Sequence, residues 1–350
     1  MEPPPERDLL RPEGSFSHGS VPSGCILRYF RKGDEDRLLE LLTDTFPRWP
    51  AVDVSVPAID HLRWKLQSRP GALRYHVIAA LGSRIIGCRL FLPQTIKIGD
   101  RFFEVRQGVD TVVHKDYQAR GLMVALTYPV PDRLRDDFDM DFSVRSGTKA
   151  LNGMRRYDER ENRYAWVDVL RLDATARAES ADGAADWSIA TVPRFDERIR
   201  PFVEEASAPF WFIVARTPES LNWRYADARA GAFTIRQAES KGRVLGYSVL
   251  RLSGDRGYIA DLLALPERHD VVESMLHDAH RHFVANGVRS VEWWATQSHP
   301  YRDLFEQTGY LLKRRRELYC QPFHVEDEVV MPFEDPTTPM HIVSGDTDLV

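Results

Sequence analysis

Hydrophobic positions follow helix and strand spacings in a regular order through the first half of the chain. Residues 34–43 place Leu38, Leu39, Leu41 and Leu42 on one stripe, which predicts an amphipathic helix. A second helix is predicted at 57–66, and apolar runs separated by Gly82-Ser83 and Gly99-Asp100 are typical of strands joined by hairpins. Strands are predicted at 75–80, 84–93, 94–105 and 109–113. A helix after Gly121, a strand at 142–145, and a last helix and strand ending at Leu172 follow. This order, β-α-α-β-β-β-α-β-α-β, predicts an α+β fold with a central mixed sheet.

The second half of the chain repeats landmarks of the first. Trp64 and Trp223 follow similar Leu-x-Trp contexts, and Gly87 and Gly246 each follow a pair of apolar residues. Subtraction gives 223 − 64 = 159 and 246 − 87 = 159, so both landmarks share one offset. Chance recurrence is the alternative explanation, but order, spacing and context agree. A repeat of this length indicates two copies of a domain rather than a solenoid, whose units reach roughly 50 residues.

Composition shifts suggest where the domains begin and end. Residues 1–24 are rich in Pro, Gly and Ser and predict a flexible tail. The small, polar stretch 174–186 predicts a linker between a domain at 25–173 and a domain at 187–325. Residues 326–350 are acidic and contain prolines, so they form either a tail or a strap over the second domain.

Overall composition excludes several classes of protein. The 350 residues are 43% hydrophobic and 28% charged, which is typical of globular domains. A net charge of −5 gives no bulk attraction to nucleic acid or anionic lipid. No apolar run reaches the ~18 residues of a membrane helix, and the N-terminus lacks the pattern of a signal peptide. The three cysteines show no zinc spacing. We expect a cytoplasmic protein with no metal, no nucleic acid and no membrane partner.

The stretch from Val112 to Leu126 carries the clearest chemical signal. An apolar strand ends, a polar loop turns, and a helix begins with Gly121 in its first turn. The N–H groups at a helix start have no intrahelical partner, and they attract anions such as phosphate. Arg120 adds a positive charge. An ordinary strand–turn–helix, in which the glycine only relieves crowding, is the alternative.

The pattern Gln118-x-x-Gly121-x-Met123 resembles the Gln/Arg-x-x-Gly-x-Gly/Ala signature of the GNAT superfamily of acyl-CoA-dependent N-acetyltransferases. The order of elements over 25–172 also resembles that family, and 187–323 repeats it. The resemblance implies a three-layer α/β/α arrangement in two GNAT-like domains, each with a mixed, mostly antiparallel sheet flanked by helices. Met123 departs from the small residue of the signature, and Pro129 and Pro131 interrupt the helix early.

The resemblance also implies which residues bind acetyl-CoA or another acyl-CoA. The pantetheine arm is expected against Val112 and Val113. Asn152 is expected to orient coenzyme or substrate. The pyrophosphate is expected on the loop residues Gln118, Ala119, Arg120, Gly121, Leu122 and Met123.

The second copy lacks these features. Its equivalent stretch, 262–272, has no glycine at the helix start, and Glu267 and Asp270 place negative charge where a pyrophosphate would lie. Phe305 stands where active members of the family often have a proton-donating tyrosine. We therefore expect a degenerate domain that shapes the substrate cleft or a dimer surface.

Acyl transfer to an amine also needs a base, an acid and an oxyanion donor. Asp110, on the strand that leads to the coenzyme, is the preferred base, with Glu104 and His114 as alternates. Tyr157 is the candidate acid for the departing thiolate. Each of these residues has a purely structural role as its alternative. The oxyanion would be held by the amide of Val113.

These observations favour an N-acyltransferase, most simply an acetyltransferase, that acts on a small-molecule primary amine and possesses a surface for a possible homodimer. A non-catalytic acyl-CoA-binding or scaffold protein is the second hypothesis. A relative of the peptidyl transferases that extend cell-wall precursors is the third, although those lack a coenzyme loop. The tryptophans Trp293 and Trp294 are expected in the core, and the basic run 313–316 on a solvated strand face.

Overall fold

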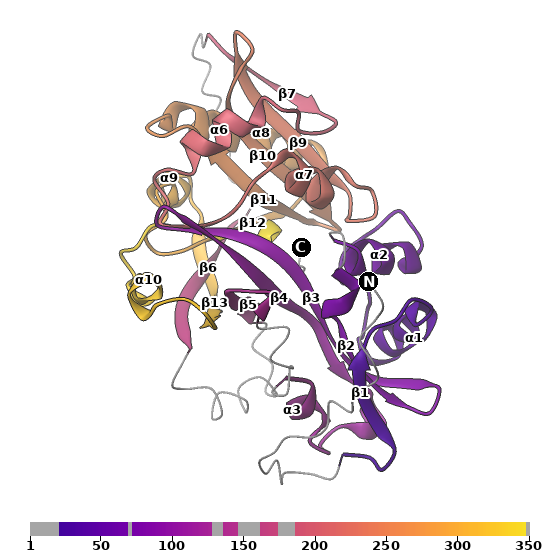
Figure 1. Cartoon of the computed structure of the whole chain (residues 1–350). Coiled ribbons are helices and arrows are strands. Elements are labelled where there is room, and N and C mark those ends of the chain that lie inside the picture. The colour runs from indigo at the N-terminus through magenta and orange to yellow at the C-terminus, as the bar shows by residue number, and fades with distance from the viewer. Residues whose placement is uncertain (1–20, 69–71, 128–135, 146–161, 174–185, 348–350) are drawn as a thin grey trace.

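The computed structural model describes residues 21–68, 72–127, 136–145, 162–173 and 186–347. It confirms the α+β fold: fourteen strands form one sheet, and helices cover it (Figure 1). No helix in these ranges is long and apolar enough to pass through a bilayer.

The described part of the first half contains the predicted elements in the predicted order, and the helix predicted before the last strand lies outside the described residues. The long strands are continuous where the sequence suggested interruptions. Its elements are β1 (Cys25–Tyr29), α1 (Glu35–Thr45), α2 (Ala58–Leu66), β2 (Val77–Leu81), β3 (Arg84–Ile98), β4 (Arg101–Val113), α3 (Leu122–Thr127), β5 (Met140–Arg145) and β6 (Arg163–Asp173).

The second half repeats this order with an additional short strand, β8, and with a helix, α9, at a place in the order where residues of the first half lie outside the described ranges. Its elements are β7 (Ser188–Val192), α6 (Ile199–Ala206), β8 (Phe212–Val214), α7 (Pro218–Leu221), a π-helical turn (Asn222–Ala226), β9 (Phe233–Ser240), β10 (Arg243–Ser253), β11 (Arg256–Ala264), α8 (His269–Ala285), β12 (Ser290–Ala295), α9 (Arg302–Gln307) and β13 (Leu311–Pro322). The strands β3 and β4 are each four residues longer than β10 and β11, so the offset between the halves falls from 159 before this hairpin to 151 after it (264 − 113).

The last strands of the two halves are exchanged. The sheet order is β1-β2-β3-β4-β5-β13-β6-β12-β11-β10-β9-β7. Thus β13, from the second half, pairs with β5 of the first, and β6, from the first half, pairs with β12 of the second. The two strands also pair with each other, and the sheets predicted for two domains are therefore continuous (Figure 1).

Helices pack on both faces of the first half. α1 and α2 cover one face of β3 and β4 through a core that includes Leu38, Leu62 and Val112, whereas α3 covers the opposite face beside Val113. Gly87 allows this close approach, since a Cβ there would lie 3.0 Å from Leu126. Gly246, its equivalent, does the same for α8, where a Cβ would lie 3.0 Å from Val271. The repeated glycines of the sequence therefore mark where a helix meets the sheet.

Residues 327–347 cross the molecule as a strap. They form α10 (Asp327–Val330), a 3₁₀ turn (Met331–Glu334) and β14 (Met340–His341). β14 pairs with β8, which itself pairs with the extended end of β3. β8 thereby connects the second half to the long β3–β4 hairpin of the first, and the strap pairs along its other edge.

The remaining sequence expectations about the core hold. Trp293 and Trp294 are fully buried in β12. Lys313, Arg314 and Arg315 are exposed on β13, where Arg314 pairs with Glu292 and Arg315 with Asp168. The basic run is thus a solvated strand face tied by ion pairs.

Candidate functional site

A gap opens between β4 and β5. The two strands pair in parallel only from Val105 to Gln107, opposite Met140 to Phe142. Beyond Gln107, β4 continues for six residues to Val113, and within the described ranges its strand partner there is β3 alone. A buried ion pair between Arg106 and Asp141 ties the strands together just before they separate. The free edge of β4 is therefore about 20 Å long, at roughly 3.3 Å per residue.

The amide of Val113 faces this gap. Gly87 and Val113 lie opposite each other, while the N–H of His114 donates to the carbonyl of Ile86 (2.9 Å). In an antiparallel ladder, this pattern marks a residue pair that is not hydrogen-bonded to each other. The N–H and C=O groups of both residues then point away from the partner strand. The N–H of Val113 consequently points away from β3 toward the unpaired edge, and its carbonyl accepts a bond from Gln118 Nε2 (3.0 Å).

The loop that follows has a backbone suited to an anion. Ala119 and Gly121 both have positive φ (59° and 74°), whereas Arg120 between them does not. Alternation of this kind turns successive N–H groups to one side, which makes an anion-binding concavity. Within the described ranges, the N–H groups of Arg120, Gly121 and Leu122 have no protein acceptor. Arg120 is exposed, with its guanidinium 5.8 Å from the ring of Tyr117.

The loop is anchored on one side by the core. Leu122 is buried, and Met123 packs against the same cluster of apolar residues, which lies under α3. Gln118, Ala119 and Arg120 remain exposed. The structure thus brings the predicted coenzyme residues from Val112 to Met123 to one end of the gap.

The corresponding gap in the second half is closed by the protein itself. Gly246 and Ala264 form the equivalent pair, and the N–H of Leu265 donates to the Leu245 carbonyl (2.9 Å). Here the amide that points away from β10 is that of Ala264, which is buried, and it donates to the hydroxyl of Tyr301 (3.0 Å). Phe305 is fully buried and stacks on Trp293 with ring centroids 3.5 Å apart.

Asp270, expected to repel a pyrophosphate there, is neutralised by a two-bond contact with Arg268 (2.8 and 2.7 Å). The closed gap is therefore a stronger obstacle to a coenzyme in this half than the charges on which the sequence argument relied.

Asp110 lies at a β-bulge in the free segment of β4. One residue of β3, Arg89, faces two residues of β4, Asp110 and Thr111, and Asp110 has a positive φ of 42°. Its carboxylate pairs with Lys65 (2.7 Å) and accepts a bond from Trp49 Nε1 (3.2 Å). Asp110 therefore has both oxygens engaged by residues on the α1–α2 side of the sheet.

The other predicted catalytic residues are placed less directly. Glu104 accepts a bond from the Thr95 hydroxyl (2.6 Å) on the neighbouring strand. His114 is buried, and its ring accepts a bond from the Asp116 N–H (3.3 Å) and contacts Arg84 (2.9 Å), which stabilises the turn after β4. Asn152 and Tyr157 lie outside the described residues.

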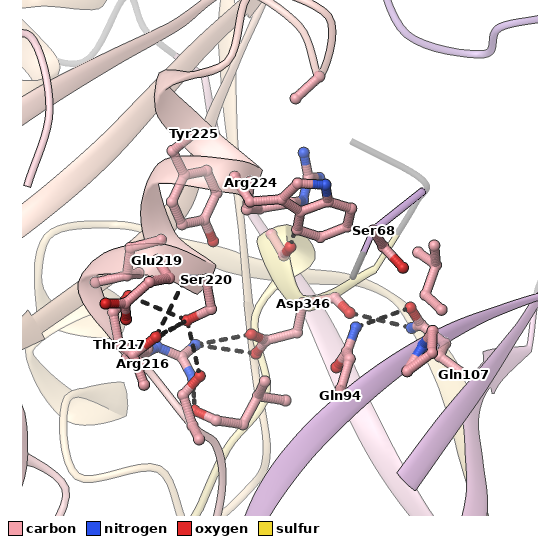
Figure 2. A pocket seen from close by; sticks show the side chains of 18 of the residues that line it. Ser68, Gln94, Gln107, Arg216, Thr217, Glu219, Ser220, Arg224, Tyr225 and Asp346 are labelled. Carbon is pink, nitrogen blue, oxygen red and sulfur yellow. Dashed lines mark hydrogen bonds and ion pairs between the residues drawn. The ribbon is translucent and has the colours of Figure 1, made fainter. Parts of the chain in front are cut away.

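A cavity of about 520 Å³ lies between the two halves (Figure 2). α2, β3 and β4 supply one wall, α7 and the π-helical turn supply the opposite wall, and the strap closes one end. Gln107, the last residue of β4 that pairs with β5, lines this cavity. Lys65 also lines it and connects it to Asp110. The cavity thus reaches the point where β4 and β5 begin to separate.

Two tryptophans form part of the cavity wall. Trp64 and Trp223 stack with ring centroids 4.5 Å apart and an interplanar angle of 15°, and Trp64 Nε1 donates to the Trp223 carbonyl (3.1 Å). The sequence singled them out only as landmarks of the repeat. Their equal offset within two similar domains was the available signal that they could meet near an axis relating the halves.

His61 is a cavity residue that sequence reasoning missed. Its Nδ1 lies 2.7 Å from the carbonyl of Arg229, which can only accept, so Nδ1 carries the proton and Nε2 is left as an acceptor. Burial, aided by the positive charge of Lys65, lowers the pKa of His61 to about 4. The ring is therefore neutral at physiological pH.

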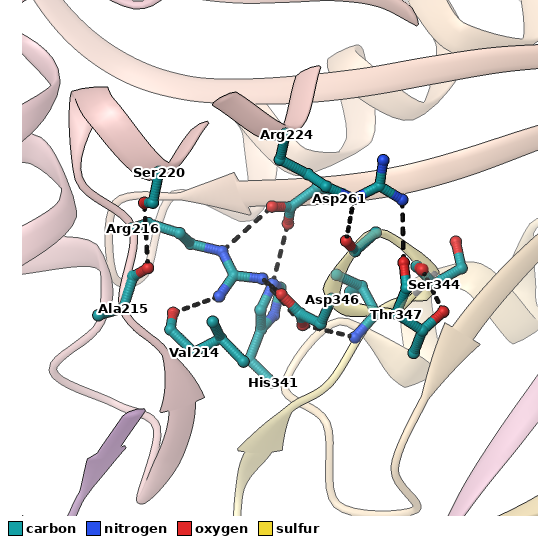
Figure 3. A network of polar contacts seen from close by, with 12 residues as sticks. Val214, Ala215, Arg216, Ser220, Arg224, Asp261, His341, Ser344, Asp346 and Thr347 are labelled. Atoms are coloured by element: carbon teal, nitrogen blue, oxygen red, sulfur yellow. Dashed lines mark hydrogen bonds and ion pairs between the residues drawn. The ribbon is translucent and has the colours of Figure 1, made fainter. Parts of the chain in front are cut away.

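The strap is fixed by a buried network of charges (Figure 3). Arg216 donates to Asp261 (3.1 Å) and through two bonds to Asp346 (2.9 and 3.1 Å). His341 lies 3.0 Å from Oδ1 of Asp261, whereas Tyr225 and Tyr247 donate to Oδ2, the oxygen that Arg216 contacts. Burial raises the pKa of the Asp261 carboxyl, but Arg216 and His341 outweigh it and hold that pKa well below its usual range.

The network also supports the cavity. Arg224 donates to the carbonyls of Gly345 (2.8 Å) and Thr347 (2.9 Å), which holds the end of the strap at the cavity. Within the described residues no group of three or more metal-ligating side chains is found.

No family model matches the sequence, and no curated protein matches it either. Solved structures do match. The GCN5-related N-acetyltransferase of Anabaena variabilis is 11% identical over 85% of this chain and 73% of its own, with a TM-score of 0.61. That of Kribbella flavida is 13% identical over 86% and 71%, with a TM-score of 0.61.

The N-myristoyltransferase of Saccharomyces cerevisiae, solved with bound myristoyl-CoA, is 10% identical over 88% of this chain and 81% of its own, with a TM-score of 0.59. At identities this low, the structural similarity shows a shared fold and nothing finer. The chain therefore has the GNAT fold, as its sequence predicts.

Proposed function

We propose that the protein is an N-acyltransferase that moves an acyl group, most simply acetyl, from acyl-CoA to a small-molecule primary amine. The observation that carries this proposal is the difference between the two halves. Among the described residues, nothing pairs with the edge of β4 beyond Gln107 or accepts from the amide of Val113, whereas Tyr301 occupies the equivalent amide of Ala264 in the second half. One coenzyme site per chain follows, in the first half.

In this proposal the coenzyme lies along the free edge of β4. The pantetheine arm pairs with Val112 and Val113, and the pyrophosphate binds the N–H groups of residues 118–123. The concave backbone at Ala119 and Gly121 and the exposed charge of Arg120 support this placement. The acyl end then lies toward Gln107, where the cavity begins.

The acceptor amine is proposed to enter from the cavity. Its nitrogen attacks the thioester carbonyl, the C–N bond forms, and the C–S bond breaks to release the coenzyme thiolate. Preorganised donors such as the Val113 amide would stabilise the oxyanion between these events. Positioning of both substrates in one gap would supply much of the rate.

Proton transfer completes the proposed reaction. Asp110 is proposed to take the proton from the amine nitrogen, with Lys65 as the positioning residue that holds its carboxylate. Tyr157 remains the candidate that protonates the thiolate. An Asp110→Asn variant is expected to lower kcat by roughly a hundredfold or more, with the pH profile changed and acetyl-CoA binding retained.

Calorimetric titration with acetyl-CoA tests the coenzyme site. Gly121→Glu places a side chain and a negative charge at a backbone position with φ 74°, and it is expected to abolish binding. Gly242→Glu is the matched control, because Gly242 has a similar φ of 82° in an open turn of the second half. Absence of binding by the wild-type protein at millimolar acetyl-CoA would overturn the proposal. Binding without turnover of any amine would favour a non-catalytic acyl-CoA-binding protein.

A further inference from the structure

Three buried polar atoms on the cavity wall have no hydrogen-bond partner among the described residues: Ser68 Oγ, Gln94 Oε1 and Trp223 Nε1. A buried polar group without a partner destabilises the folded state, and native structures contain few of them. Their presence on one cavity wall indicates where a ligand supplies the missing hydrogen bonds.

The free atom of Gln94 is fixed as an acceptor by a chain of contacts that begins at the strap. The carbonyl of Asp346 can only accept, so Gln107 donates to it through Nε2 (3.0 Å). Gln107 therefore turns Oε1 toward Gln94, which donates through its own Nε2 (3.2 Å). Only Oε1 of Gln94 is left for the cavity, and Figure 2 shows these residues side by side.

The free atom of Trp223 is a donor. An indole nitrogen donates and cannot accept, and the ring is held in place by its stack with Trp64. The hydroxyl of Ser68 can take either role. These three atoms therefore offer one fixed acceptor, one fixed donor and one adaptable group, in addition to the acceptor Nε2 of His61.

The charged groups of the wall already have partners. Arg216 pairs with Asp261 and Asp346, Lys65 pairs with Asp110, and Glu219 pairs with Arg200. Arg224 is bonded to strap carbonyls, and His61 is neutral. A second charge on a ligand would have to compete with these contacts, whereas an uncharged polar group would not.

We propose that the acceptor of the transfer reaction is an amine whose other polar groups are hydroxyls, and that Gln94 and Trp223 select it. A hydroxyl both donates to Gln94 Oε1 and accepts from Trp223 Nε1, whereas an ammonium only donates and a carboxylate only accepts. The amine part rests on the proposed function, but the hydroxyl-binding wall rests on the cavity alone.

Direct binding to the full chain without coenzyme tests this wall. Four amines with six carbons serve as probes: glucamine (1-amino-1-deoxysorbitol), hexylamine, 1,6-diaminohexane and 6-aminohexanoate. Glucamine is expected to bind at least tenfold more tightly than the other three in calorimetric titrations. Gln94→Met and Trp223→Phe are each expected to weaken glucamine binding roughly threefold to tenfold, the effect of one neutral hydrogen bond, without changing hexylamine binding.

Further variants sharpen the test. Gln94→Glu adds a carboxylate to the wall and is expected to shift the preference toward 1,6-diaminohexane. Ser68→Ala removes the adaptable group and supplies an independent reading if another variant fails to fold. Trp166→Phe is the control, because Trp166 is exposed on β6 and outside the cavity wall, and it is expected to leave all four affinities unchanged.

The outcomes separate this inference from the proposed function. Equal binding of the four probes, or an unchanged glucamine preference in Gln94→Met, Trp223→Phe and Ser68→Ala, overturns the hydroxyl-binding wall even if acetyl-CoA binds and is consumed. Selective glucamine binding that these variants weaken supports the wall, even if acetyl-CoA does not bind and the transferase proposal fails.

Discussion

Trp64 and Trp223 occupy equivalent positions in the two halves, 159 residues apart, and their indole rings lie face to face with centroids 4.5 Å apart. Equivalent residues meet only near the axis that relates two copies, so this stack marks that axis. The residues that follow them, Lys65 and Arg224, line the same cavity. The cavity therefore forms between the copies rather than within either one.

The stack is expected to contribute to stability. Trp64 is 4% exposed, so Trp64→Ala removes a large buried ring and is expected to lower the free energy of unfolding by about 3–5 kcal/mol. A double-mutant cycle of Trp64→Leu and Trp223→Leu isolates the ring–ring term, expected at roughly 0.5–1.5 kcal/mol. Urea unfolding measures both, and additive effects in the cycle would show that the stacked rings are not coupled.

The closed gap of the second half predicts a second stability effect. Tyr301→Phe leaves the Ala264 amide without its acceptor, and it is expected to lower the free energy of unfolding by about 1–3 kcal/mol in urea. Tyr258→Phe is the matched control, since no partner of the Tyr258 hydroxyl is found in the described part of the chain. Similar losses in the two variants would contradict the assigned role of the Tyr301 hydroxyl.

The strap depends on a glycine. A Cβ at Gly345 would lie 2.0 Å from the Tyr225 hydroxyl and 2.7 Å from the Ala260 carbonyl, so the strap would have to move away. Gly345→Ala is expected to cost roughly 1–3 kcal/mol or more and to expose residues 327–347 to limited proteolysis. Gly108→Ala, where the nearest atom of Arg89 is 3.6 Å from the new Cβ, serves as the comparison. An equally protected strap in both variants would show that this contact does not hold it.

Acid is expected to destabilise the protein through buried histidines. Burial lowers the pKa of His61, His76 and His280 from 6.5 to about 4. Above pH 6.5 these rings are neutral in both states. Between pH 6.5 and 4 the unfolded chain takes up protons that the folded chain does not. The free energy of unfolding therefore decreases as the pH is lowered, by up to roughly 3 kcal/mol for each histidine.

His280→Gln tests this pH dependence, because glutamine does not titrate and can still bond the Tyr310 hydroxyl that His280 contacts at 2.9 Å. Urea unfolding at pH 7 and pH 4.5 is expected to show a smaller loss in this variant than in the wild type. Substitution of the exposed His324 by Gln is the control. Equal losses in all three proteins would exclude His280 as a source of the acid sensitivity.

The fold was predictable because its signals are local. The leucine stripe of α1, the hairpin at Gly82-Ser83 and the helix start at Gly121 each depend on neighbouring residues, and each element is found where expected. The exchange of β6 and β13 was not predictable. The residue pattern of an apolar strand is the same whichever sheet edge the strand joins, so only the packing of the whole chain decides its neighbours.

The site was predictable in part for the same reason. The loop from Val112 to Met123 is one continuous motif, so its residues had to lie together. The cavity combines residues from α2, β3, β4, the π-helical turn and the strap, and no spacing in the sequence connects Gln94 with Asp346. Asp110 was identified by its position on a strand, but its pairing with Lys65 requires the packing of α2 on β4.

The exchanged strands have a consequence for synthesis on the ribosome. β5 and β6 are translated early, but β13, which lies between them, emerges only after nearly all of the second half. Until then the nascent chain carries open strand edges, which favour pairing with other chains. The second half therefore supplies the strand that completes the sheet of the first.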